Sequence, residues 1–124
     1  MNADLQRCIE KCLDCYWICR HESSAHCLEA GGDHVKPEHF RLMMSCAEIC
    51  RAAADIMLIG SPHHEAVCAA CAEICDACAK SCEEVHDMEE CARVCHACAE
   101  SCRQMGGPPE HAAMPGEYYE QPDS

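Results

Sequence analysis

The sequence contains 16 cysteines among 124 residues, and their spacing repeats along the chain. Most follow one another at alternating steps of three and four residues, which places them on one helical face because each residue turns the helix by about 100°. In helical bundles this pattern normally carries Leu or Ile toward the core. We therefore predict inward-facing thiols and sixteen candidate metal ligands: Cys8, Cys12, Cys15, Cys19, Cys27, Cys46, Cys50, Cys68, Cys71, Cys75, Cys78, Cys82, Cys91, Cys95, Cys98 and Cys102.

Dense thiolates are soft ligands, which select Cu(I), Zn(II) or iron–sulfur clusters. Several Zn(II) ions with four thiolates each would leave unbalanced negative charge inside a narrow bundle. About one Cu(I) per thiolate would be nearly neutral, and the Cys-x2-Cys-x2-Cys runs typical of clusters are absent. We predict a store of multiple Cu(I) ions per chain. The alternatives are a zinc-buffering, metallothionein-like protein and a redox or electron-transfer protein.

Two uses of cysteine without a metal remain open. Cysteine can pack as a small hydrophobe, although Leu and Phe are scarce here. It can also form disulfides, but neighbours three or four residues apart on one helix are poorly oriented for a bridge. Both alternatives explain the repeated cysteine spacing less well than metal binding does.

We call the row of cysteines on one helical face a stripe. Other soft or borderline ligands extend these stripes at one end of the expected bundle, near residues 31–36 and 86–87. They are the predicted entrance ligands for Cu(I): His26, His39, Met43, His86 and Met88. The alternative for each histidine is a solvated surface position. The first stripe continues there as Glu22 and His26, which leaves Cys27 about 80° away from it, as a peripheral ligand or an inert thiol. At the opposite end the stripes continue as Leu5, Met57, His64 and Met105, which is mostly apolar.

The elements that must position these residues are helices. Glycine and proline divide the sequence into segments of about 3–30, 37–59, 62–85 and 88–105. Asp87 and Glu90 have the spacing of a capping box at the start of the last segment. No strand-like alternation is present, so we predict an all-α, antiparallel four-helix bundle with a cysteine-lined core over residues 1–105. Residues 106–124 are predicted to be a flexible C-terminal tail.

The formal net charge of −13, with only 9 Lys and Arg residues, argues against nucleic acid and anionic membranes as partners. The N-terminal residues lack the features of an export signal, and reduced thiols suit the cytosol, so we expect a cytoplasmic protein. No hydrolytic constellation or nucleotide-binding loop is evident, and we expect no enzymatic activity. Apolar residues beyond the buried face of the first helix predict association of bundles; they are Ile9, Leu13, Tyr16, Trp17 and Ile18.

The arrangement of cysteine runs resembles the cytosolic branch of the bacterial copper storage proteins over residues 5–105. The resemblance implies a homotetramer of four-helix bundles, each holding many Cu(I) ions, with an entrance at a His- or Met-bearing end. Relatives carry further cysteines near the end of the first helix, where this chain has Glu22 and His26. The runs that carry the resemblance are Cys8-x3-Cys12-x2-Cys15-x3-Cys19, Cys46-x3-Cys50, Cys68-x2-Cys71-x3-Cys75-x2-Cys78-x3-Cys82 and Cys91-x3-Cys95-x2-Cys98-x3-Cys102.

Overall fold

A computed structural model describes residues 2–106, and this part of the chain is helical with no strand. The predicted all-α architecture is confirmed. The elements are α1 (Ala3–His21), a π-helical segment η1 (Glu22–Cys27), α2 (Leu28–Ala30), a 3-10 turn η2 (Gly32–Val35), α3 (Pro37–Ile59), α4 (His64–Glu83) and α5 (Glu89–Met105). The predicted tail, residues 106–124, lies outside the described residues except for Gly106.

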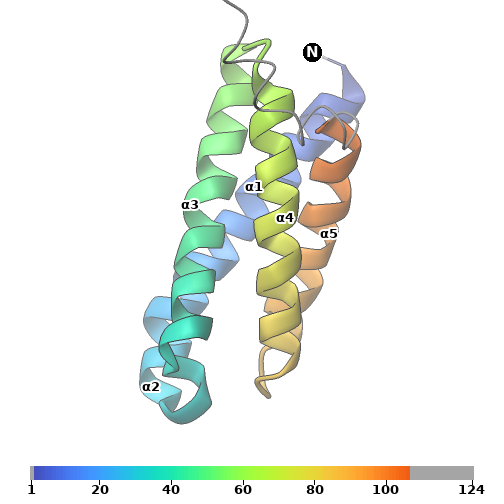
Figure 1. The fold of residues 1–124 in the computed structure, drawn as a ribbon. Helices are drawn as coiled ribbons and strands as arrows, with labels where there is room; N and C mark the ends of the chain where they lie inside the picture. The colour runs from blue at the N-terminus through green and yellow to red at the C-terminus, as the bar shows by residue number, and fades with distance from the viewer. Residues whose placement is uncertain (1, 107–124) are drawn as a thin grey trace, which may run out of the picture.

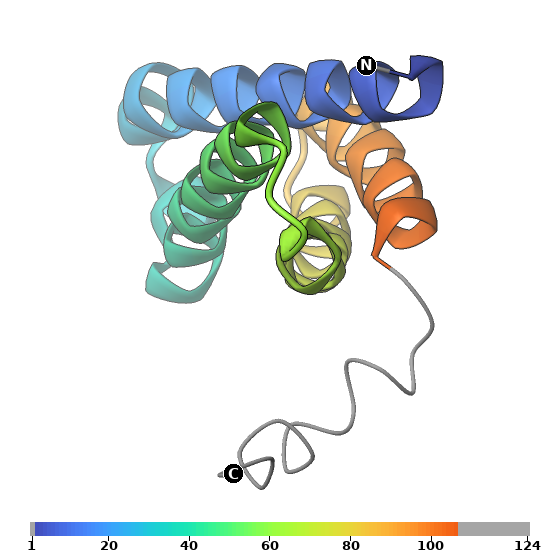
Figure 2. The ribbon, with the colours of Figure 1, turned by 90° about the horizontal axis from the view of Figure 1, so that it is seen from above.

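The long helices form an antiparallel bundle (Figure 1). Helix α1 packs against α3 and α5, and α4 packs against the same two helices from the other side. Figure 2 shows α4 along its axis while α1 lies across the picture, so α1 crosses the other helices obliquely. The short α2 lies at the same end as the α4–α5 connection. We call this end the mouth, formed by residues 22–36, the first turn of α3 and residues 83–90.

The first predicted helix is not regular, because η1 interrupts it. A π-helical turn holds one extra residue, which rotates the following face by about 100°. This rotation returns Cys27 to the buried side, where it is 0% exposed. Ser23 is also 0% exposed, and its hydroxyl donates to the Arg20 carbonyl oxygen at 3.1 Å. The prediction that Glu22 and His26 continue the stripe is therefore wrong, since Ser23 and Cys27 continue it instead.

The connections agree with the predicted breaks in all but one detail. Pro37 opens α3, and Gly60 ends it in the left-handed conformation with φ 81°. The capping box at Asp87 does not form, because Asp87 has φ 65° and the N-cap of α5 is Met88, without a side-chain cap. Asp tolerates left-handed backbone better than most residues. Met88 follows directly and is 2% exposed.

Cysteine, alanine and methionine make up most of the core. All sixteen cysteines are at most 1% exposed, and the buried alanines include Ala47, Ala54, Ala79 and Ala99. Alanine allows neighbouring helices to approach closely, which suits a core filled by small thiols. Gly106 continues this close packing at the end of α5, since a Cβ there would lie 2.9 Å from the Ala69 backbone.

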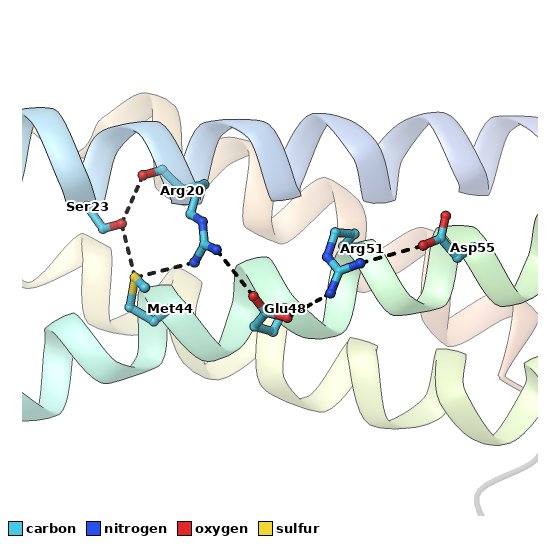
Figure 3. A network of polar contacts seen from close by, with 6 residues as sticks. All are labelled: Arg20, Ser23, Met44, Glu48, Arg51 and Asp55. Carbon is cyan, nitrogen blue, oxygen red and sulfur yellow. Dashed lines mark hydrogen bonds and ion pairs between the residues drawn. The ribbon is translucent and has the colours of Figure 1, made fainter.

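The surface of the bundle carries ion pairs and some exposed apolar side chains. Arg20 on α1 pairs with Glu48 on α3 at 3.4 Å, and Arg51 pairs with both Glu48 and Asp55 (Figure 3). Such exposed pairs each contribute about 0–1 kcal/mol. On α1, Trp17 is 63% exposed, whereas the predicted surface residue Ile9 is buried. Among the described residues, no helix has the length and apolar character needed to cross a membrane.

Candidate metal centre

The fifteen cysteines other than Cys27 form a continuous column of thiols along the bundle axis, which we call the thiol column. Neighbouring sulfurs lie close together, from 3.3 Å between Cys50 and Cys75 to 4.0 Å between Cys15 and Cys19. A disulfide bond measures about 2.05 Å, so these are separate thiols. All sixteen cysteines of the chain are free.

The sulfurs gather in groups that combine several helices. In each group the ligand atoms lie within 4.8 Å of one another. One group draws a cysteine from every long helix of the bundle. The groups are Cys8, Cys68 and Cys102; Cys12, Cys71, Cys98 and Cys102; Cys15, Cys50, Cys75 and Cys98; and Cys15, Cys19, Cys46 and Cys95. Cys15, Cys98 and Cys102 each belong to two groups, so the groups are linked rather than separate.

Hydrogen bonds between thiols control which sulfurs ionise. Hydrogen bonds from neighbouring thiols, that of Cys15 first, lower the pKa of Cys46. The pKa of Cys50 is raised by neighbouring thiols, that of Cys15 first. Neighbouring thiols, that of Cys19 first, lower the pKa of Cys78. Adjacent thiols therefore ionise at each other's expense, and cations that enter the column must displace protons.

A cluster of one thiol and two thioethers lies between the thiol column and the mouth. The Cys27 sulfur is 3.8 Å from the Met43 sulfur and 3.9 Å from the Met88 sulfur. All three side chains are at most 2% exposed. Burial is the main cause that raises the pKa of Cys27 to about 11. The structure thus brings Cys27 together with two of the predicted entrance ligands, and the three sulfurs offer a soft site for a metal ion.

Histidines surround this cluster on the mouth side. His26 and His34 make an edge-to-face contact with ring centroids 5.0 Å apart, and the His34 and His86 rings are 5.9 Å apart. His26 Nε2, His34 Nδ1 and His39 Nε2 are buried without a hydrogen-bond partner among the described residues. His86 is exposed. Unpaired buried imidazole nitrogens are uncommon, and here three of them lie on residues of the mouth.

His34 is the one mouth histidine that sequence reasoning missed. It lies in η2, outside the helical stripes, so a search by helical spacing does not find it. The available signal was its place between Gly32 and Pro37, in the connection that closes the mouth. The 5% exposure of this loop residue follows from packing that the sequence pattern does not show.

The opposite end of the bundle is more apolar. The Met57 sulfur lies 3.7 Å from that of Cys68, and Leu5 and Met105 are partly buried against the core. His64 is half-buried, and its Nδ1 is 3.0 Å from the Ser61 carbonyl oxygen. We call this the closed end, formed by Leu5, Met57, His64 and Met105.

Comparison with known proteins identifies the family. The sequence profile described as "Csp: Copper storage protein" matches residues 1–107. The chain belongs to this family. The uncharacterized cysteine-rich protein YhjQ of Bacillus subtilis (strain 168) is 41% identical over 87 residues, which cover 70% of this chain and 79% of YhjQ.

Solved structures of similar proteins have the same fold. The Nmul_A1745 protein of Nitrosospira multiformis is 54% identical with a TM-score of 0.84, covering 86% of this chain and 97% of its own. The Cu(I)-bound copper storage protein BsCsp3 is 40% identical with a TM-score of 0.78, covering 84% of this chain and 99% of its own. The apo form of copper storage protein 3 from Bacillus subtilis is 40% identical with a TM-score of 0.74, covering 82% of this chain and 98% of its own. Csp membership thus agrees with the resemblance inferred from the cysteine runs.

Proposed function

We propose that this protein stores copper by binding many Cu(I) ions through the thiolates of its core. The observation that carries this proposal is the linked thiol column, in which single cysteines belong to two ligand groups. Family membership and the likeness to a Cu(I)-bound copper storage protein support it. The sixteen cysteines are the proposed ligands, Cys27 included.

The linked groups favour Cu(I) over Zn(II). A structural zinc site takes four ligands in a closed tetrahedron. Filling adjacent groups with Zn(II) would require Cys15 and Cys98 to serve two ions each. Cu(I) accepts two or three thiolates and carries one positive charge, so a chain of ions with shared ligands remains near neutrality. The same chemistry makes a zinc buffer the weaker candidate.

The test is an anaerobic titration of the fully reduced protein with Cu(I) against a chromophoric Cu(I) chelator. We expect retention of roughly one ion per thiolate. Replacing the five α4 cysteines at positions 68, 71, 75, 78 and 82 with serine should lower the capacity by about a third, since five of the sixteen thiols are lost. A variant with His96 replaced by Gln is the matched control, since His96 is exposed and pairs with Glu83. Retention of four ions or fewer by the wild type would contradict storage.

The mouth is the proposed entrance for Cu(I). Its ligands are His26, His39, Met43, His86 and Met88, and the geometry adds His34 and Cys27. Replacing both Met43 and Met88 with leucine should slow Cu(I) uptake more than it lowers the final capacity, because the thiol column is intact. The same change at Met57, at the closed end, is the control. Equal slowing by both variants would contradict a single entrance.

The proposal includes a storage role without catalysis and a cytoplasmic location. The core of residues 2–106 presents thiols and thioethers, which bind soft metal ions. Sixteen reduced cysteines are typical of a reducing compartment. Fractionation of cells that produce the protein tests the location, and recovery outside the cytoplasm would contradict it.

Association into a homotetramer is proposed through the outer face of α1. Leu13 and Trp17 are 41% and 63% exposed there and lie four residues apart on one helical face, and apolar side chains that lie together on a surface mark interaction sites. Replacing Trp17 with glutamate should reduce the mass measured by light scattering, whereas the same change at the exposed Ile59 of α3 should leave it unchanged.

Residues 1–105 are the proposed folding and copper-binding unit, and a chain ending after Gly106 should keep its copper capacity.

A further inference from the structure

We propose that Ser81 is a positioning residue for His39, holding its ring so that Nε2 presents a lone pair to incoming Cu(I). This inference rests on the proposed function of the mouth. Ser81 belongs to α4 and His39 to the first turn of α3, so the contact joins two helices. The His39 Nδ1 and Ser81 Oγ atoms lie 2.8 Å apart.

The two nitrogens of His39 have different surroundings. Nδ1 contacts Ser81, whereas Nε2 is buried and has no partner among the described residues. The whole residue is only 4% exposed. An unpaired buried polar group is costly and uncommon in native structures, and a ligand that later occupies the site is one reason to keep it. His39 Nε2 is therefore available to a cation that enters the mouth.

The place of His39 on α3 supports this role. Met43 lies four residues later on the same helical face, and its sulfur contacts Cys27. His39 thus precedes Met43 by one helical turn on α3, and Met43 belongs to the cluster of soft sulfurs.

The proposed role of the serine hydroxyl concerns the tautomer of His39. A neutral imidazole carries its proton on one nitrogen only, so Nε2 has a free lone pair when Nδ1 is protonated. In the proposed arrangement Ser81 Oγ accepts a hydrogen bond from Nδ1–H, which leaves the Nε2 lone pair free. Histidines that bind metals generally donate their other ring N–H to an oxygen in this way. Ser81 is half-buried and lines a groove between α3 and α4, so its own proton is free to bond water.

The first test compares the rate of Cu(I) uptake from a chromophoric Cu(I) complex by three variants of the full chain. Ser81→Ala should lower the initial rate about 10-fold, within the 10–100-fold range known for residues that orient metal ligands. Ser81→Thr retains the hydroxyl and should restore the rate. Ser45→Ala is the matched control, because Ser45 is an exposed serine of α3. A wild-type rate in Ser81→Ala would overturn the proposal.

A second test separates positioning from a loss of structure. In the apoprotein, the 15N signals of the His39 ring should report a proton on Nδ1 in the wild type and a mixture of tautomers in Ser81→Ala. Combining Ser81→Ala with His39→Phe should slow uptake no further than His39→Phe alone, because the serine acts through this ring. Additive slowing, or unchanged tautomers, would overturn the proposal. A low Cu(I) capacity of the wild-type protein would instead contradict the proposed storage function.

Discussion

Cys27 is buried beside two thioethers and carries its proton more tightly than an exposed thiol does. Burial, followed by the charges of Cys91 and Glu22, raises its pKa from 9.0 to about 11. Cys27 therefore remains a neutral thiol at physiological pH until a cation displaces its proton. Binding of Cu(I) by Cys27 would therefore release a proton.

The raised pKa of Cys27 predicts a loss of stability of the reduced apoprotein in alkali. The folded state binds more protons than the unfolded state between the two pKa values, so the free energy of unfolding falls as pH rises from 9.0 to about 11. In Cys27→Ser this group no longer contributes, and the decline should be shallower. Urea unfolding at several pH values measures both slopes, and equal slopes would contradict the assignment.

At the mouth, the sequence pattern predicts some of the candidate ligands but not others. Met43 and Met88 extend regular stripes, and both are buried where the stripes place them. His34 lies on a loop, and no helical period reaches it. Cys27 was placed off its stripe because a regular helix was assumed, whereas η1 adds a residue to the turn. Local backbone irregularity, rather than residue type, accounts for these two errors.

At the scale of elements, η1 aligns Cys27 with the rest of the first helix. The π-helical segment contains one residue more than a regular α-helix needs to reach the same face. A regular α-helix with one residue deleted would therefore also place Cys27 on the buried face of α1. The Ser23 hydroxyl, bonded to the Arg20 carbonyl oxygen, is the local contact that accompanies the irregular turn. The sequence predicted all the long helices, since their stripes are long and regular, but not this change of winding.

Deleting Ser24 should therefore be tolerated, because it converts η1 to a regular helix and leaves Cys27 inside. We expect the apoprotein to keep its melting temperature and Cys27 to remain unreactive toward a thiol reagent in the folded state. Inserting an alanine after Ser24 is the control, since it rotates Cys27 outward by about 100°. Reactive Cys27 in the deletion variant would show that η1 has another role.

The close approach of α5 to α4 at Gly106 predicts a second effect at this scale. In Gly106→Ala the new Cβ would lie 2.9 Å from the Ala69 backbone, which cannot move as a flexible side chain does. We expect a loss of about 1–3 kcal/mol in the free energy of unfolding, the usual cost of overpacking. Gln104→Ala, at an exposed position of α5, should change it by less than about 0.5 kcal/mol. Chemical denaturation of the two variants measures the difference.

At the scale of the whole molecule, small thiols replace the large side chains that usually fill a core. Cysteine and alanine dominate the buried residues, while Phe40, Ile49, Val67 and Ile74 lie only at its margin. The apoprotein accordingly has few large apolar contacts. Bound Cu(I) supplies cross-links between helices that the apo core lacks. The fold and the position of the thiols follow from the sequence pattern, whereas the linkage between ligand groups depends on how the helices pack.

Copper should therefore stabilise the molecule strongly. A ligand that binds only the folded state, at a thousandfold excess over its Kd, adds about 4 kcal/mol for each site. We expect the melting temperature of the anaerobic protein to rise steadily as Cu(I) is added, up to about one ion per thiolate. Removal of the metal by a strong Cu(I) chelator should reverse the rise. A plateau after the first few ions would contradict a continuous core.

The closed end has a consequence for the order in which stored ions leave. The linked ligand groups share Cys15, Cys98 and Cys102, so an ion would move along the thiol column by exchanging shared ligands. With one opening, the ions would form a single file in which the last arrival departs first. Copper taken up early would then be the deepest and the longest retained. The bundle would thus preserve a record of its own filling, which two copper isotopes supplied in succession would reveal.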